Sequence, residues 1–259
     1  MEIQNVSNLA IVGVLISMLL SVGVPIALLI VGKKKYHAKI SSFFIGAGTF
    51  LLFAMVLEQI LHLLVIRVGG LNEQSNRWLY YIYAAAAAAV FEETGRLIAM
   101  KFWMKKRLDF ANGLMYGIGH GGCEAIMIGG LANINNLISM LMINSGAMQQ
   151  SLALLPDELK NQTLEQLSAL WTTPASLFFA SGIERIGALL LQIGLSLMIY
   201  KAVQTKKWGM AAIAYVLHFA VDFVAVAGAN YCSVWIMEVF IFVAAIGTLF
   251  LSLQINKQE

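Results

Sequence analysis

The chain has 259 residues, of which 59% are hydrophobic and only 12% are charged, and its mean hydropathy is +0.78 with a formal net charge of +3. Soluble globular domains do not reach this apolar content, so the composition excludes that class and indicates an integral membrane protein. The two cysteines, far apart in the chain, are too few for a disulfide framework.

Seven segments are long and apolar enough to cross a bilayer, whose core needs about 20 residues per helix. They cover residues 6–32, 40–66, 78–100, 112–144, 175–200, 209–228 and 232–254. The fourth is too long for one straight span and is expected to break near Gly129 and Gly130 or between Asn133 and Asn136. No basic stretch precedes the first, which is therefore expected to be a retained helix and not a signal peptide.

The expected fold class is thus an all-α polytopic membrane protein, a bundle of about seven transmembrane helices in which residues 1–259 form a single domain. Its orientation follows from the basic residues, because cytoplasmic loops retain positive charge. One set of connections holds twelve of them: Lys33, Lys34, Lys35, Lys39, Lys101, Lys105, Lys106, Arg107, Lys201, Lys206, Lys207 and Lys257. The opposite set holds only Arg67, Arg77 and Lys160. This distribution predicts an amino terminus outside and a cytoplasmic carboxyl terminus, and it explains the net charge without a nucleic-acid partner.

The connection at residues 150–172 is amphipathic, with leucines at helical spacing opposite acidic and basic side chains. On the predicted topology it is an extracellular segment. It is expected either to pack on the helix ends as a surface connector or to lie on the outer leaflet as a lid.

Charged side chains inside a bilayer are costly, so they face the bundle interior and mark function. This chain carries them in six of the predicted spans: Glu58, His62, Glu92, Glu93, Arg96, His120, Glu124, Glu184, Arg185, His218, Asp222 and Glu238. Counting about 1.5 Å per residue from the basic end of each helix brings one subset to a common depth of roughly 12–17 Å. That subset is the glutamate pair 92–93 with His120 and His218, which we expect in one cavity that opens toward the cytoplasmic half of the membrane.

Each of these histidines has a carboxylate four residues further along its own helix face: Glu124 follows His120, and Asp222 follows His218. Such a carboxylate can orient the imidazole or serve as a second metal ligand.

The glutamate pair has a cation of its own, because Arg96 lies four residues after Glu92 and three after Glu93. Arg96 is expected to keep Glu92 charged and to leave Glu93 freer for proton transfer.

Two further pairs, Glu58 with His62 and Glu184 with Arg185, lie nearer the outer side. They are expected to form either a structural network or the outer wall of the substrate cavity.

Four stretches in this order, FEETGR, GIGHGGCE, ERIGALLLQIGLS and LHFAVD, resemble the YhfC-type intramembrane proteases over nearly the whole chain. That family is related to the CAAX prenyl proteases and the bacteriocin-processing membrane proteases, whose pattern is a Glu-Glu-x-x-x-Arg helix, a later Phe-x-x-x-His and a final His-x-x-x-Asn. The resemblance implies a multi-pass protein of a cell membrane, the plasma membrane of a bacterium. Its expected partners are membrane lipid and a membrane-associated peptide or protein, with the oligomeric state left open.

The resemblance also implies roles for individual residues. The catalytic set falls on Glu92, Glu93, Arg96, His120 and His218, with the arginine one residue closer to the glutamates than in the CAAX group. One of the glutamates would deprotonate a water molecule that attacks the peptide bond. The two histidines would stabilise the oxyanion directly, or bind a divalent metal such as zinc.

In the version with a metal, Glu124 would join the two histidines as a ligand. The chain departs from the resemblance at two positions of this polar set. Asp222 replaces the asparagine of the CAAX group, and Gln192 stands where the YhfC pattern has a histidine. Because glutamine is a poor zinc ligand, the metal site is incomplete, the reaction proceeds without a tightly held metal, or the protein is inactive.

Two functions from other classes compete with proteolysis. Carboxylate and histidine chains in membranes also form proton or ion relays, so a proton- or ion-coupled transporter is one alternative. A non-catalytic binding or immunity protein on a protease scaffold is the other, and Gln192 favours it.

Overall fold

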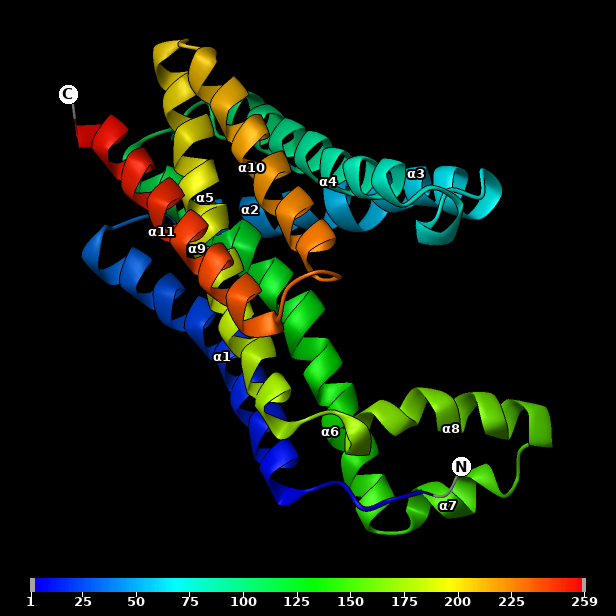
Figure 1. Ribbon diagram of the computed structural model, residues 1–259. Coiled ribbons are helices and arrows are strands. Elements are labelled where there is room, and N and C mark those ends of the chain that lie inside the picture. The colour runs from blue at the N-terminus through cyan, green and yellow to red at the C-terminus, as the bar shows by residue number, and fades with distance from the viewer. Residues whose placement is uncertain (1–2, 258–259) are drawn as a thin grey trace.

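The computed structural model describes residues 3–257, and these form helices without any strand (Figure 1). The α-helices are α1 Asn8–Lys35, α2 Ile40–Leu52, α3 Gln59–His62, α4 Glu73–Ile98, α5 Phe110–Glu124, α6 Leu131–Asn144, α7 Ala147–Leu152, α8 Asp157–Thr172, α9 Ala175–Thr205, α10 Gly209–Gly228 and α11 Val234–Lys257. Four π-helical stretches join or extend them: η1 Phe53–Glu58, η2 Leu63–Val68, η3 Ala99–Trp103 and η4 Ala125–Gly130.

The predicted all-helical membrane fold is confirmed. Within the described residues six helical stretches are long and apolar enough to cross a membrane: Asn8–Lys35, Ile40–Val68, Phe110–Asn144, Ala175–Thr205, Gly209–Gly228 and Val234–Lys257. The remaining predicted span, 78–100, falls largely in α4. After a kink at Asn76, residues 77–98 of this helix cover about 33 Å, which is long enough to cross, but its tyrosines and charged residues make it less apolar than the six. The direction in which the termini face stays a prediction.

The long fourth segment is continuous where a break was expected. The chain passes from α5 through η4 into α6, and Gly129 and Gly130 lie in the π-helical turn. Asn133 donates a hydrogen bond of 2.9 Å to the carbonyl oxygen of Gly129. A π-helical turn absorbs one extra residue and changes the direction of the following side chains without interrupting the helix.

Helix α9 lies at the centre of the bundle. In its most apolar stretch 78% of the residues are buried, against 22–28% in the corresponding stretches of the five other spans. The reason is that α9 packs against α1, α5, α10 and α11. Burial is nearly continuous from Leu191 to Ala202. Side chains from this part of α9 therefore lie inside the bundle and not on its surface.

Helices α2 and α5 approach until their backbones touch. A Cβ at Gly46 would collide with the carbonyl oxygen of Tyr116, and a Cβ at Gly119 would collide with that of Phe43. Only glycine permits this approach. It brings His120, the residue after Gly119, directly against α2.

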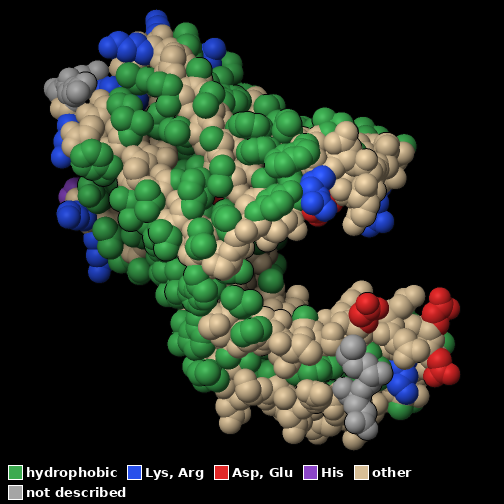
Figure 2. All heavy atoms as spheres, viewed as in Figure 1, with side chains coloured by type: hydrophobic (Ala, Val, Ile, Leu, Met, Phe, Trp, Pro, Cys, Tyr) green, Lys and Arg blue, Asp and Glu red, His purple; other side chains and the backbone are tan. Residues whose placement is uncertain are grey.

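Two projections flank a hollow on one side of the molecule (Figures 1 and 2). One is formed by α3 and the beginning of α4, and the other by α7, α8 and the end of α6. The predicted amphipathic segment corresponds mainly to α8, which buries Leu164 and Leu170 and exposes Asp157 and Glu158.

Candidate active site

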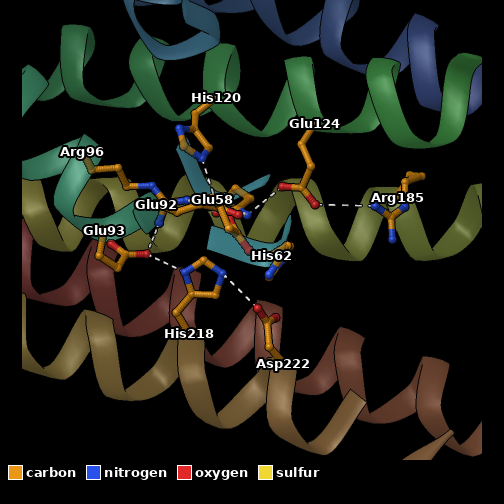
Figure 3. A network of polar contacts seen from close by, with 11 residues as sticks. Glu58, His62, Glu92, Glu93, Arg96, His120, Glu124, Arg185, His218 and Asp222 are labelled. Atoms are coloured by element: carbon orange, nitrogen blue, oxygen red, sulfur yellow. Dashed lines mark hydrogen bonds and ion pairs between the residues drawn. The ribbon is translucent and has the colours of Figure 1, made fainter. Parts of the chain in front are cut away.

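Helix α4 contributes the three charged groups at the centre of the polar network in Figure 3. Arg96 is completely buried and donates hydrogen bonds to both glutamates: to Glu93, and from Nη2 to Glu92 Oε2 at 3.0 Å. The three-residue and four-residue spacings on one helix face make both contacts possible at once. One guanidinium therefore neutralises part of the charge of each carboxylate.

Helix α5 brings His120 to the same carboxylate oxygen. Its Nε2 lies 2.9 Å from Glu92 Oε2, and since a carboxylate can only accept, Nε2 carries the proton of this bond. The ring is fully buried and is held edge-on by Phe50, with ring centroids 5.4 Å apart. Its Nδ1 has no hydrogen-bond partner among the described residues.

Helix α10 places His218 between two carboxylates. Its Nδ1 lies 2.8 Å from Glu93 Oε1, and its Nε2 lies 3.3 Å from Asp222 Oδ2. Both partners only accept, so both contacts form when the imidazole carries two protons. The Asp222 side chain is 30% exposed. The contact with Asp222 is an ion pair, longer than the hydrogen bond to Glu93, and it borders accessible space.

Gln192 of α9 joins the central groups to the next carboxylate. Its Nε2 lies 3.0 Å from Glu92 Oε2 and 2.6 Å from Glu124 Oε2, while its Oε1 accepts from Arg96. Both ends of the amide are thus in use. The glutamine that interrupts the expected ligand pattern is a bridge between a cation and two carboxylates.

The two glutamates of α4 differ in access, in the opposite sense to the expectation that Glu93 would be freer. Arg96 pairs with both, and Glu93 is the enclosed one: its side chain has no exposed surface, and its Oε2 is buried without a partner among the described residues. The side chain of Glu92 keeps 9% of its surface exposed. Glu92 is therefore the member of the pair that an entering water molecule can reach.

Three charged residues nearer the beginning of α9, Glu124, Glu184 and Arg185, continue the network and are called the outer cluster from here on. Arg185 donates to Glu184 and lies 3.5 Å from Glu124 Oε1. These three residues line a cavity of about 100 Å³ together with Gln192 and Asp222.

This cavity does not include the glutamate pair, His120 or His218 in its wall, so the expected opening of their cavity toward the lysine-rich end stays a prediction. The wall of the cavity beside Gln192 lies near the beginning of α9 at Glu184, near the end of α10 at Ala225 and near the beginning of α11 at Ile241. All three positions are far from Lys201 and Lys257. The depth count placed the residues along each helix, but it could not tell on which side of them the neighbouring helices separate.

Glu58 and His62, expected to form either a structural network or the outer wall of the substrate cavity, lie next to the central groups of the network in Figure 3. Glu58 is 6% exposed, lies 3.2 Å from Nε2 of His62 and interacts electrostatically with Glu92 and His218. The hydroxyl of Tyr83 holds Nδ1 of His62 at 2.8 Å. The four-residue spacing of an acid and a histidine in the second span was the available signal.

A bound metal ion does not fit these residues as they are arranged. Among the described residues no three His, Cys, Asp or Glu side chains are gathered in a way that could hold one. The three expected ligands bond different partners. His120 bonds Glu92 and His218 bonds Glu93, whereas Glu124 bonds the side-chain amide of Gln192. The guanidinium of Arg96 already lies between the central carboxylates, where it would repel a second cation.

Comparison with known proteins identifies relatives across most of the chain. The sequence model of the family described as YhfC intramembrane metalloprotease matches residues 17–242. The chain is also 39% identical over 205 residues, 78% of its own length and 78% of the relative's, to the uncharacterized membrane protein YhfC of Bacillus subtilis (strain 168). No solved structure matches it. The matched range contains every residue of the polar network described here.

Proposed function

The chain belongs to the YhfC intramembrane metalloprotease family, and from this premise we propose that it hydrolyses a peptide bond of a membrane-associated peptide or protein with a water molecule that Glu92 activates. One observation carries the choice of base. Glu92 is held by Arg96, His120 and Gln192 through a single oxygen, Oε2, and still keeps part of its side chain exposed. A general base needs this combination of a fixed position and access for water.

The proposed step consumes one water molecule. Glu92 accepts a proton from the water as its oxygen bonds to the carbonyl carbon of the substrate. The same proton then passes to the peptide nitrogen as the C–N bond breaks, so that a carboxylic acid and an amine leave. Because the surroundings are buried and poor in water, the charges of this site act more strongly than they would in solution.

His218 is the proposed partner of the oxyanion. Its Nε2 faces Asp222 at 3.3 Å, a contact loose enough to exchange for a substrate oxygen, while the bond from Nδ1 to Glu93 fixes the ring. Arg96 supplies the positive charge at the two glutamates. The family name denotes a metal, but the donor groups present do not fit one as arranged, so each proton and each contact is assigned to the chain's own residues.

A non-catalytic binding role on the same scaffold is the second candidate. The observation in its favour is Gln192, which occupies Glu92 and Glu124 with one amide group. A protein that only binds its partner would leave that partner intact.

The test compares the wild-type chain with Glu92→Gln, which keeps the shape of the side chain but cannot take a proton from water. Glu165→Gln is the matched control, because Glu165 is exposed on α8 away from the site. New peptide ends are identified by mass spectrometry in membranes that contain each variant, and the cleavage is then repeated with purified protein in ¹⁸O-labelled water.

The proposal expects ends that appear with the wild type and with Glu165→Gln and are absent with Glu92→Gln. Each new carboxyl group should carry one ¹⁸O atom. Equal cleavage by the wild type and both variants would remove Glu92 from the mechanism, and no cleavage by any of the three proteins would favour the binding role.

A further inference from the structure

A second cavity adjoins the first and carries an acid that the hydrolysis does not use. It has a volume of about 200 Å³ and shares Glu184, Ala225 and Ile241 with the cavity beside Gln192. It extends past Glu238 to the turn between α10 and α11. The two cavities are therefore adjacent compartments that extend from Gln192, a hydrogen-bond partner of Glu92, to this turn.

Glu238 lacks the partners that the other acids of the network have. The residue is only 7% exposed, and its Oε2 is buried with no hydrogen-bond partner among the described residues. Its neighbours in the cavity wall are largely apolar, such as Met237 and Val234. Burying a carboxylate oxygen without a hydrogen bond costs free energy. A hydrogen-bond donor that enters the cavity would therefore stabilise Glu238.

The charges around this space favour a cationic occupant. Four acids line the two cavities, namely Glu124, Glu184, Asp222 and Glu238, against the single cation Arg185. The first three contact Gln192, Arg185 and His218 respectively. Glu238 interacts electrostatically with Arg185, but its Oε2 has no hydrogen-bond partner among the described residues and is left for a positive group that comes from outside the chain.

We propose that the cavity of Glu184 and Glu238 is a recognition subsite for a primary ammonium or guanidinium group of the substrate, a lysine or arginine side chain or a free amino terminus. The subsite rests on the proposed proteolytic function and specifies the substrate class for it. An ammonium group brings three donors, enough to satisfy Glu238 and to contact the half-exposed Glu184 at the same time.

The distance along α9 relates the subsite to the scissile bond. Glu184 precedes Gln192 by eight residues, which is about 12 Å along a helix. An extended peptide covers about 3.3 Å per residue, so the cationic residue is expected about two to four residues from the bond that is cleaved.

A thiol in the same wall provides a readout that does not depend on catalysis. Cys232 lines the cavity, is exposed and is unpaired. In a Cys123→Ala background, with the protein in lipid nanodiscs, its alkylation by N-ethylmaleimide is timed by mass spectrometry. The added probes are n-hexylammonium, the uncharged 1-hexanol and calcium ions.

The proposal expects n-hexylammonium to slow the alkylation of Cys232 and 1-hexanol to leave it unchanged. Glu238→Gln should raise the concentration needed for half-protection about tenfold, as the loss of one charge pair in a partly hydrated site implies. Glu238→Asp, which keeps the charge, should retain most of the protection and so shows that the cavity is folded. Glu165→Gln is the matched control and should behave as the wild type.

Equal protection by 1-hexanol, stronger protection by calcium, or protection that survives Glu238→Gln would overturn the subsite. The cleavage assay adds a separate arm, in which lysine is replaced by norleucine at successive positions of a cleaved peptide. A loss of cleavage confined to positions about two to four residues from the bond supports the subsite, and indifference at every position refutes it. If nothing is cleaved, the protease proposal fails while the protection of Cys232 still decides whether the subsite exists.

Discussion

Two arginines of the bundle are each held by glutamates, and they differ in what surrounds them. Arg96 of α4 has no exposed side-chain surface, whereas the side chain of Arg185 of α9 is 13% exposed and its contact with Glu124 is a long 3.5 Å. Histidines complete the inner network around Arg96. No histidine bonds to the described residues of the outer cluster, beside which Glu238 keeps an unmatched oxygen.

This difference in burial and in hydrogen bonding suits the two regions to different tasks, proton transfer and recognition of a charged partner. The inner region fixes its carboxylates from several helices, as proton transfer requires, since a displacement of about 1 Å can cost a hundredfold in rate. The outer region is looser, borders two cavities and retains an unbalanced charge, as recognition of a charged partner requires. The same kind of substitution, made once in each region, tests whether the two regions differ in this way.

The largest expected difference concerns the two arginines themselves. Arg96→Met leaves Glu92 and Glu93 buried without their cation and should lower the free energy of unfolding by about 3–5 kcal/mol. Arg185→Met removes a more exposed group and should lower it by about 1.5–3 kcal/mol. Reversible unfolding in mixed detergent micelles measures both. Equal losses would mean that the inner network is no more tightly coupled than the outer one.

Shortening a glutamate side chain by one methylene group should affect the cleavage rate differently in the two regions. Glu92→Asp withdraws the proposed base from its water molecule and should lower the cleavage rate about a hundredfold. Glu124→Asp makes the same change at the residue that contacts Arg185 and should lower the cleavage rate by much less. The rate of ¹⁸O incorporation into product measures both. An equal loss in the two variants would place the base elsewhere, whereas a shifted pH dependence with little loss at Glu92 would favour a proton relay.

A methyl group added to a glycine tests how closely each region is packed. At Gly119 the new Cβ meets the backbone carbonyl of Phe43, which cannot move aside, so Gly119→Ala should destabilise the protein by about 1–3 kcal/mol. At Gly129 it meets Ser21 Oγ at 2.6 Å and Arg185 Cγ at 2.7 Å, side chains that can rotate. Gly129→Ala should therefore destabilise the protein less than Gly119→Ala in the same unfolding assay, and the reverse order would show that the contact of α2 with α5 is not the tighter one.

The smallest expected effect concerns metal content. Gln192→His places a third imidazole in the network beside Glu92 and Glu124, where it could complete a set of three protein ligands with water as the fourth. Zinc bound per chain should rise only slightly, because Arg96 still lies beside Glu92, and elemental analysis after dialysis measures it. Ala188→His adds the same ring one turn toward the outer region and should not raise it. Unchanged zinc content in Gln192→His would show that the inner region cannot be converted into a metal site by one ligand.

Much of the fold could be predicted because its signals are local. Apolar length marks six of the spans directly. The spacing of Glu92, Glu93 and Arg96 allows one guanidinium to reach both carboxylates on a single helix face. The same rule predicted the contact of His218 with Asp222, which forms at 3.3 Å. It could not predict that Glu124, four residues after His120, bonds Gln192 and Arg185 of another helix instead.

The sequence by itself determined which helices carry charge and which of these charges share a helix face, because burial of a charged group is costly and the period of a helix fixes its face. Only the tertiary structure decided that Glu92 is the accessible glutamate, that Glu58 joins the site and that the cavities lead toward the turn between α10 and α11. These facts depend on the angles at which helices cross and on where they separate. Contacts such as that of Gly119 with Phe43 set those angles, and they join residues that no spacing along one helix relates.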